Sequence, residues 1–348
     1  MKETIKVLIA DDSLFMRYLT ADILKNAGGF EVLDFARDGK EAADKCCKLK
    51  PDVVIMDMLM GDYDGTMGVK LIMEKCPTPI IILSALGATD MNPILETLKL
   101  GAVDYHHKPD RSSKDIKDKD EELILKVKNA AQVTLKEVMS KTQHVKENVN
   151  QHTFSSNINY DVIVIGSSTG GPTAVESVLT RLPGNLSVPV VIVQHMPENF
   201  VPSFAARLDQ LTPLKVTMAK KDDVLEPGKV LVAPGSRNMI LRHNVDGKVV
   251  CDFTTQRYKE YNFPSVNGLM LSAAEVYGAR AIGVILTGMG KDGAEGMKAI
   301  KDKGGYTVGQ SKDTCVVYGM PREAAEIGAL KSVVPLNEIG PFVVSCLE

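Results

Sequence analysis

The sequence predicts two α/β domains, each built around a mainly parallel, doubly wound sheet. The chain has 348 residues, which suits two hydrophobic cores better than one. Short apolar runs rich in valine and isoleucine alternate with helix-like segments in the N-terminal third and again beyond residue 160, a pattern typical of parallel sheets. A polar stretch with few apolar residues separates the two patterns, as expected of a linker.

The first domain is expected over residues 1–139. Its strands are predicted at 7–10, 53–56 and 80–83, with a weaker strand around Val32 and a fifth that ends near Lys108. Apolar residues at 124, 127, 131, 135 and 138 have the spacing of an amphipathic helix, which we predict over residues 122–139 at the end of this domain. Residues 140–159 have the polar composition of a flexible linker.

The second domain is expected over residues 160–348. Apolar runs predict strands at 162–165, 190–193, 229–233 and 281–286, with helical segments after most of them. Residues 249–253 follow the turn-prone Asn244-Val245-Asp246-Gly247, and we expect an antiparallel hairpin strand there, appended to the main sheet.

Composition narrows the range of partners and locations. A net charge of −3 with 24% charged residues lacks the basic excess of most nucleic-acid binders, so no nucleic-acid partner is expected. The apolar run before Asp11 is too short for a signal peptide, and no run approaches the roughly 20 residues of a membrane span. We therefore expect a cytoplasmic protein that does not insert directly into a membrane.

The six cysteines contain no C-x-x-C pair. Adjacent Cys46 and Cys47 on an expected helix suit neither a zinc site nor a disulfide framework. We expect all the cysteines to be reduced and to lie in or near the cores, where free cysteine is commonly found.

Polar side chains gather where the strands of the first sheet end. Asp11 and Asp12 end the first strand, Asp57 the third and Ser84 the fourth, and Lys108 lies at the end of the fifth. Three carboxylates repel one another unless a hard cation joins them, and such a set suits Mg²⁺. The lysine and the hydroxyl could then bind a phosphoryl group on Asp57. A single aspartate at any of these positions would equally suit a helix cap.

This constellation resembles the receiver domain of response regulators over about residues 4–139. The matching segments are Ala10-Asp11-Asp12-Ser13, Asp57-x-x-Met60-x-x-x-Asp64-Gly65, Leu83-Ser84-Ala85 and Asp104-Tyr105-His106-His107-Lys108-Pro109. The resemblance implies a flavodoxin-like fold, Mg²⁺ bound by the three aspartates, a phosphate accepted by Asp57 from a histidine kinase, and a switch pair of Ser84 and Tyr105. Receivers usually carry proline where this chain has Gly61, which is expected to loosen the loop without removing a catalytic group.

The second domain offers a serine, a histidine and an aspartate on three loops. Ser168 lies at the centre of Gly166-x-Ser168-x-Gly170, between a predicted strand and a helix, as in a nucleophile elbow. His195 follows the strand at 190–193, and Asp292 lies in a glycine-rich loop after the strand at 281–286. Loops at the carboxyl ends of parallel strands converge on one crevice. There, a histidine could take the serine proton while the carboxylate orients the imidazole.

Each of these features also has a simpler interpretation. A glycine-rich turn between strand and helix binds phosphate as readily, although this one fits neither G-x-G-x-x-G nor the P-loop pattern. A lone histidine is more often structural, and Asp292 could cap its own turn. Ser167 is a competing nucleophile, but the elbow geometry would aim it back along the strand, so Ser168 is preferred.

From residue 161 onward, the chain resembles the catalytic domain of chemotaxis protein-glutamate methylesterases, the CheB family. The matching segments, in order, are Ile165-Gly166-Ser167-Ser168-Thr169-Gly170-Gly171, Val193-Gln194-His195-Met196-Pro197, Val232-Ala233-Pro234-Gly235 and Leu286-Thr287-Gly288-Met289-Gly290-Lys291-Asp292-Gly293. The resemblance implies a Rossmann-like three-layer α/β esterase domain that needs no cofactor for the ester chemistry. It makes Ser168 the nucleophile, His195 the base and Asp292 its orienting carboxylate, with Thr169 and the Met289 backbone near the oxyanion.

Together, the two resemblances imply a phosphorylation-activated serine hydrolase. It would demethylate glutamate methyl esters on methyl-accepting chemotaxis receptors, releasing methanol, and would also deamidate certain receptor glutamines. The chemotaxis histidine kinase CheA would be the phosphodonor, and the unphosphorylated receiver would cover the catalytic crevice. The alternative is a non-enzymatic response regulator whose output domain binds a nucleotide or a protein through its glycine-rich loop.

Overall fold

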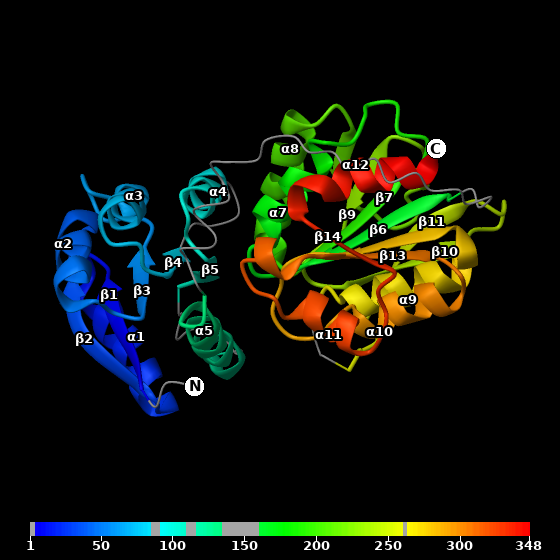
Figure 1. The fold of residues 1–348 in the computed structure, drawn as a ribbon. Helices are drawn as coiled ribbons and strands as arrows, with labels where there is room; N and C mark the ends of the chain where they lie inside the picture. Colours follow the sequence, from blue (N-terminus) through cyan, green and yellow to red (C-terminus); the bar gives the residue numbers. More distant parts are fainter. Residues whose placement is uncertain (1–3, 85–90, 109–115, 134–159, 260–262) are drawn as a thin grey trace. The chain divides into compact units, whose positions relative to one another are not determined.

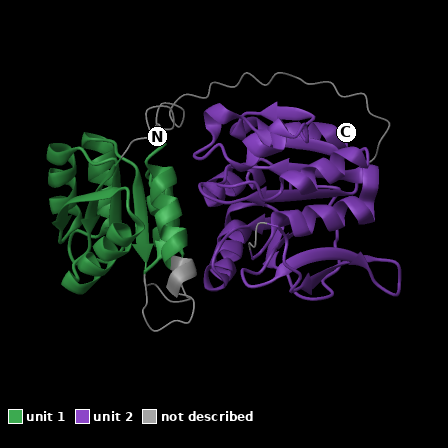
Figure 2. Ribbon diagram, turned by 90° about the horizontal axis from the view of Figure 1, so that it is seen from below, with its two compact units in different colours: residues 1–87, 91–144 green, residues 88–90, 145–348 purple. Residues whose placement is uncertain are grey.

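The computed structural model describes residues 4–84, 91–108, 116–133, 160–259 and 263–348. The chain divides into two compact units, one comprising residues 1–87 and 91–144 and the other residues 88–90 and 145–348 (Figure 2). The predicted linker at 140–159 lies outside the described residues. No helix in the described part of the chain is long and apolar enough to cross a membrane.

The first unit contains a five-stranded parallel sheet in the order β2-β1-β3-β4-β5 (Figure 1). Its strands are β1 (Ile5–Ala10), β2 (Phe30–Ala36), β3 (Val53–Asp57), β4 (Ile80–Ser84) and β5 (Asp104–His107). Every residue of β3 and β4 is buried, as in a central strand covered on both faces, so these strands read as continuous apolar runs. The predicted parallel sheet is confirmed.

Each strand of this unit is followed by a helix. The helices are α1 (Leu14–Ala27), α2 (Gly39–Leu49), α3 (Gly65–Lys75), α4 (Asn92–Lys99) and α5 (Ile116–Ala130). Ser13, Asp38 and Asp64 cap α1, α2 and α3 by accepting hydrogen bonds from backbone N–H groups.

Helix α5 differs from the helix predicted at 122–139. It begins at Ile116 and ends at Ala130, and residues 134–139 lie outside the described part. The fully buried residues are Leu123, Val127 and Ala130, whereas Ile124 is only partly buried. The apolar spacing therefore indicated the right element and, at Val127, part of its buried face, but it gave the wrong start and end.

The expectation that every cysteine is reduced is wrong for one pair. Cys47 on α2 and Cys76 at the end of α3 form a disulfide with a Cα–Cα distance of 5.3 Å. Adjacent positions on a helix point in different directions, so Cys46 instead lies in the core with its Sγ 3.3 Å from Thr78 Oγ1. Spacing alone cannot show a pairing between two cysteines that are 29 residues apart on different helices. The other four cysteines are free and buried, as expected.

The second unit contains a seven-stranded parallel sheet in the order β14-β13-β12-β6-β7-β9-β8. Its strands are β6 (Val162–Ser167), β7 (Val190–Gln194), β8 (Lys215–Met218), β9 (Lys229–Val232), β12 (Ala281–Ile285), β13 (Tyr306–Gln310) and β14 (Ser332–Val334). The four predicted strands are present. β8 and β14 were not predicted, because they are short edge strands with exposed or half-buried residues; β13 was also missed.

The hairpin is antiparallel as expected, but it is not part of the main sheet. β10 (Asn238–His243) and β11 (Val249–Thr254) form a separate two-stranded sheet. β10 packs instead against α9 (Val266–Tyr277), where the Leu241 backbone N–H donates to Ser272 Oγ at 3.0 Å. The turn residues thus indicated the hairpin, while packing on a helix decides where it docks.

Helices complete the second unit around its sheet. They are α7 (Gly171–Leu179), α8 (Val201–Leu211), α9, α10 (Ala294–Asp302), α11 (Met320–Glu326) and α12 (Leu336–Leu347), with short 3₁₀ turns η1 (Glu198–Phe200), η2 (Gly278–Arg280) and η3 (Lys312–Thr314). β6 lies between β12 and β7 in the sheet. The loops that follow these three strands therefore emerge side by side at the carboxyl edge, where open α/β sheets bind ligands.

Candidate active site

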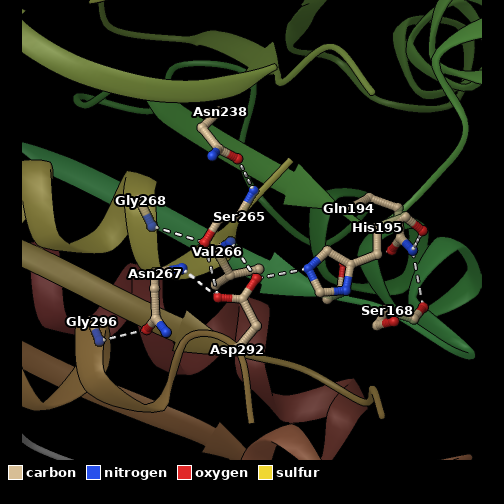
Figure 3. Close-up of polar contacts among 11 residues, drawn as sticks. Ser168, Gln194, His195, Asn238, Ser265, Val266, Asn267, Gly268, Asp292 and Gly296 are labelled. Atoms are coloured by element: carbon tan, nitrogen blue, oxygen red, sulfur yellow. Dashed lines mark hydrogen bonds and ion pairs between the residues drawn. The ribbon is translucent and has the colours of Figure 1, made fainter. Parts of the chain in front are cut away.

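The structure joins His195 and Asp292, which are 97 residues apart in the sequence, at the carboxyl edge of the second sheet. His195 Nε2 lies 2.8 Å from Asp292 Oδ2 (Figure 3). The Asp292 side chain is fully buried, and the His195 side chain is 16% exposed. The carboxylate therefore holds the Nε2 edge of the imidazole, while part of the ring remains exposed to solvent.

The N-terminus of α9 fixes the carboxylate of Asp292. Val266 N–H donates to Oδ2 at 2.7 Å, and Asn267 N–H donates to Oδ1 at 2.9 Å. The hydroxyl of Ser265, which caps this helix, donates to Oδ1 at 3.1 Å. A helix N-terminus favours negative charge, so the carboxylate is held in the ionised form that an imidazolium needs beside it.

The pKa of Asp292 reflects these contacts. Burial alone would raise the pKa of this carboxyl, but the hydrogen bond and charge of His195 and the backbone N–H groups of Asn267 and Val266 outweigh it. The pKa of Asp292 is therefore lower than that of an ordinary aspartate.

Ser168 lies directly after β6, in the turn that leads into α7. Its backbone N–H donates to Thr287 O at 3.1 Å, and its carbonyl accepts from Gly171 N–H at 2.7 Å. Gly170 has a φ of +72°, a left-handed conformation that glycine adopts without strain and that the sharp turn requires. Figure 3 shows Ser168 on the side of the imidazole away from Asp292. Since Nε2 faces the carboxylate, Nδ1 is the ring nitrogen on the serine side.

Ser167, the competing serine, has a different environment. It is fully buried at the end of β6, and its hydroxyl donates to Gln194 Oε1 at 2.6 Å. Ser168 is partly exposed. The strand register pairs Ser167 with Gln194, so Ser168 and His195 follow at the same level of the sheet.

The two residues expected near the oxyanion lie on loops that meet beside Ser168. Thr169 is buried, and Thr287 Oγ1 lies 3.0 Å from its carbonyl oxygen. Met289, partly exposed, follows Gly288, where an added Cβ would lie 2.8 Å from Ser168 Cβ. The turn after Ser168 opens α7, whose N-terminal end is positive.

The polar residues of the first unit also come together as expected. Oxygen atoms of Asp11, Asp12 and Asp57 all lie within 4.8 Å of one another. Lys108 Nζ lies 2.8 Å from Asp11 Oδ2 and 2.8 Å from Asp57 Oδ2. Carboxylate oxygens are the ligands that Mg²⁺ prefers, so this donor set fits the cation.

Burial and the neighbouring charges together shift the pKa values of Asp57 and Lys108 in this cluster. Burial raises the pKa of Asp57, and the neighbouring charge of Asp11 raises it further, while Lys108 only partly offsets both. Burial opposes the charge of Lys108, but its hydrogen bonds to Asp11 and Asp57 outweigh burial and raise the pKa of the ammonium group. Ionising a buried carboxyl costs free energy, and a positive charge placed beside it favours the ionised form.

The other residues expected from the receiver resemblance lie on β4, on β5 and in the loop after β3. Ser84 is fully buried at the end of β4, and its carbonyl accepts from Lys108 N–H at 2.9 Å. Tyr105 is buried on β5, where burial raises the pKa of its hydroxyl well above the usual value. Gly61 has a φ of +65°, a conformation closed to proline, whose ring fixes φ near −65°.

Sequence reasoning missed the residues that support the candidate catalytic groups. Ser265 and Asn267 hold Asp292, and the side chain of Asn238 accepts from Ser265 N–H at 2.6 Å. Gln194 contacts both the serine loop and the histidine loop. Ser265 could have been found as a helix cap, whereas the others depend on contacts between distant segments.

Comparison with known proteins decides the family. The profile described as CheB methylesterase matches residues 163–343, and the one described as Response regulator receiver domain matches residues 7–118. A Protein-glutamate methylesterase/protein-glutamine glutaminase of Archaeoglobus fulgidus is 42% identical over 347 residues, covering 99% of this chain and 98% of the relative. This chain belongs to the CheB methylesterase family.

Two further comparisons agree with this assignment to the CheB family. A relative from Carboxydothermus hydrogenoformans, named Protein-glutamate methylesterase/protein-glutamine glutaminase 2, is 43% identical over 351 residues and covers 99% of each chain. The crystal structure of the Thermotoga maritima CheB methylesterase catalytic domain superposes with a TM-score of 0.52 at 38% identity, covering 54% of this chain and all of that one. The chain is therefore a response-regulator methylesterase/glutaminase enzyme, as its sequence indicated.

Proposed function

We propose that Ser168, His195 and Asp292 are the nucleophile, base and orienting carboxylate of this methylesterase, acting on glutamate methyl esters of methyl-accepting chemotaxis receptors. The main support is the contact between His195 Nε2 and Asp292, which leaves Nδ1 on the side of Ser168 (Figure 3). Asp292 accepts a hydrogen bond from Nε2–H, so Nδ1 carries the lone pair that a general base needs.

The reaction proceeds in two halves. His195 Nδ1 takes the Ser168 proton as Oγ attacks the ester carbonyl carbon, and the carbonyl electrons move to the oxygen. When the tetrahedral intermediate collapses, the bond to methoxide breaks, and the imidazolium gives its proton to the departing oxygen, which releases methanol. Water then attacks the acyl-serine by the same proton transfers and frees the glutamate.

Deamidation of a receptor glutamine uses the same steps, with ammonia as the leaving group. The buried charge of Asp292 stabilises the imidazolium in both halves of the reaction. We assign oxyanion stabilisation to backbone N–H groups near Thr169 and Met289, because these loops adjoin the nucleophile.

For the receiver, we propose that Asp57 accepts a phosphoryl group from the chemotaxis histidine kinase CheA and that this raises the hydrolase activity. Asp11, Asp12 and Asp57 would hold Mg²⁺, which neutralises charge on the phosphoryl oxygens when bound. Lys108, already paired with Asp57, would contact the same oxygens, and Ser84 with Tyr105 would act as the switch pair.

The corresponding division of the chain is a receiver over residues 1–139, a linker over 140–159 and a catalytic domain over 160–348. We place the protein in the cytoplasm, where the kinase and the receptor's signalling region would be accessible to it. No cofactor is assigned to the ester chemistry, because serine, histidine and carboxylate together supply the nucleophile and the proton transfers.

Methanol release from methylated receptor membranes tests this proposal. The wild-type protein, Ser168→Ala and Asp57→Asn are compared with and without a small phosphodonor and Mg²⁺. We expect no release by Ser168→Ala, and stimulation by the phosphodonor in the wild type but not in Asp57→Asn. Full release by Ser168→Ala would contradict the assigned nucleophile and favour the alternative, a binding role for the glycine-rich loop. Equal stimulation of Asp57→Asn would contradict the assigned phosphoacceptor.

A further inference from the structure

We propose that Gln194 is a positioning residue that sets the geometry between the nucleophile and the base, with Ser167 as its anchor. This inference rests on the proposed roles of Ser168 and His195. It concerns a side chain that does not contact the reacting atoms but is bonded to the backbone of both residues that do.

The amide group of Gln194 links the two catalytic loops through one nitrogen atom. Gln194 Nε2 donates to the carbonyl oxygen of Ser168 at 2.9 Å and to that of His195 at 2.9 Å (Figure 3). An amide nitrogen carries only two hydrogens, so these two bonds use both of them. Gln194 therefore has no donor left for an oxyanion and acts through Ser168 and His195.

Ser167 fixes the other end of the amide. Its hydroxyl donates to Gln194 Oε1 at 2.6 Å. The carbonyl oxygens of Ser168 and His195 can only accept, so the NH₂ group must face them, and this leaves Oε1 facing the hydroxyl, which can donate. Gln194 is 2% exposed and Ser167 is fully buried. Water cannot readily replace these bonds, so their loss would leave buried polar groups without partners.

The backbone of α7 makes room for this arrangement. A Cβ atom added at Gly171 would lie 2.1 Å from Gln194 Oε1 and 2.9 Å from Ser167 Cβ. No larger residue fits there unless the amide moves. Gly171, the first residue of α7, and Ser167, the last of β6, therefore both pack against the amide of Gln194, which ends β7.

The backbone ladder alone does not restrain the two catalytic residues in this way. His195 N–H donates to Ser167 O at 3.0 Å, which ties the strand ends one residue before the nucleophile. The Gln194 amide extends that connection to the carbonyl group of Ser168 itself. A shift of about 1 Å in a reacting group can cost about a hundredfold in rate, so this restraint bears on catalysis rather than on substrate binding.

The test uses the full-length protein and methanol release from methylated receptor membranes. Gln194→Met keeps the side-chain length but removes both donors and the acceptor, and Ser167→Ala removes only the anchor. We expect kcat to fall by about ten- to a hundredfold in Gln194→Met and by less in Ser167→Ala, with KM unchanged in both. Thr307→Val is the matched control. Thr307 is also fully buried and hydrogen-bonded, but it lies near the N-terminal end of β13, away from the carboxyl edge of the sheet.

Gln194→Glu supplies a readout that a merely structural role would not move. The introduced carboxyl keeps an acceptor for Ser167, and in its protonated form it can donate to one of the two carbonyl groups. Its ionised form would instead repel both carbonyl oxygens. Burial raises the pKa of a carboxyl, so the protonated form becomes more populated as the pH is lowered from about 8 to about 6. We therefore expect the ratio of the kcat of Gln194→Glu to that of the wild type to rise over this range.

The outcomes separate this inference from the proposed function. Wild-type kcat in Gln194→Met, an equal loss in Thr307→Val, or a kcat ratio for Gln194→Glu that does not change with pH would each overturn the role of Gln194. If Gln194→Met does not fold, as judged by circular dichroism, Ser167→Ala and Gln194→Glu decide by the same criteria. Methanol release by Ser168→Ala would instead overturn the proposed nucleophile, and the role of Gln194 with it.

Discussion

Replacing Asp292 with asparagine removes one charge and exchanges one acceptor for a donor. Oδ2 accepts from His195 and Val266 N–H, and Oδ1 accepts from Ser265 Oγ and Asn267 N–H. An amide has only one oxygen, so in either orientation its NH₂ group meets a backbone N–H that has lost its acceptor. We expect Asp292→Asn to lower the free energy of unfolding by about 1–3 kcal/mol, the cost of one buried unsatisfied group.

The effect on catalysis depends on which oxygen the NH₂ group replaces. In place of Oδ1, it can donate to Ser265 Oγ, and the amide oxygen still accepts from His195, so the imidazole keeps its tautomer but loses the stabilising charge. In place of Oδ2, it forces the proton of His195 onto Nδ1, which then cannot act as a base. Loss of such a carboxylate reduces kcat by up to about 10⁴-fold, so we expect a reduction of about 10²- to 10⁴-fold.

The pH dependence of stability gives a second check on Asp292→Asn. The pKa of Asp292 is lowered in the folded protein, so its charge stabilises the fold above the unfolded pKa, which is about 4. That contribution is lost as the pH falls through the lower folded-state pKa. Thermal unfolding should therefore show the wild-type advantage shrinking below about pH 4. A kcat within a factor of about two of the wild type, or an advantage that grows at low pH, would refute the reasoning.

Three further changes test other parts of the structure. Because burial raises the pKa of Asp57, Asp57→Asn should raise the melting temperature of the metal-free protein near neutral pH, with the gain vanishing towards about pH 4; a lower melting temperature would count against the assigned environment. Gly288→Ala places a Cβ 2.8 Å from Ser168 Cβ, so its rate of methanol release should fall about tenfold or more, and an unchanged rate would be inconsistent with this packing. Cys47→Ser removes the disulfide that closes a loop of 29 residues, so it should lower the free energy of unfolding by about 3–4 kcal/mol under oxidising conditions but not under reducing ones. The same redox dependence in Cys46→Ser would argue against the assigned pairing.

The sequence was most informative where local chemistry decides the structure. Central strands such as β3, β4 and β6 are buried on both faces, so each reads as an unbroken apolar run whatever surrounds it. The positions of Ser168, His195 and Asp292 follow from the same pattern, because each comes shortly after such a strand, and the carboxyl edge of a parallel sheet gathers these loops.

Features that depend on packing between distant segments could not be predicted in this way. The hairpin was expected from its turn, but it docks on α9 rather than in the main sheet. The disulfide between Cys47 and Cys76 depends on how α2 and α3 face each other. The bonds made by Gln194 depend on the register of β6 and β7, which places it beside Ser167, and register is a property of the assembled sheet.

The central claim is that Ser168, and not its neighbour, is the nucleophile. The most direct test measures methanol release from methylated receptor membranes by Ser168→Ala and Ser167→Ala side by side, with phosphodonor and Mg²⁺ present. The account predicts that Ser168→Ala loses at least about 10³-fold in rate, whereas Ser167→Ala keeps its nucleophile and loses less than about a hundredfold. An inactive Ser167→Ala beside an active Ser168→Ala would contradict the account.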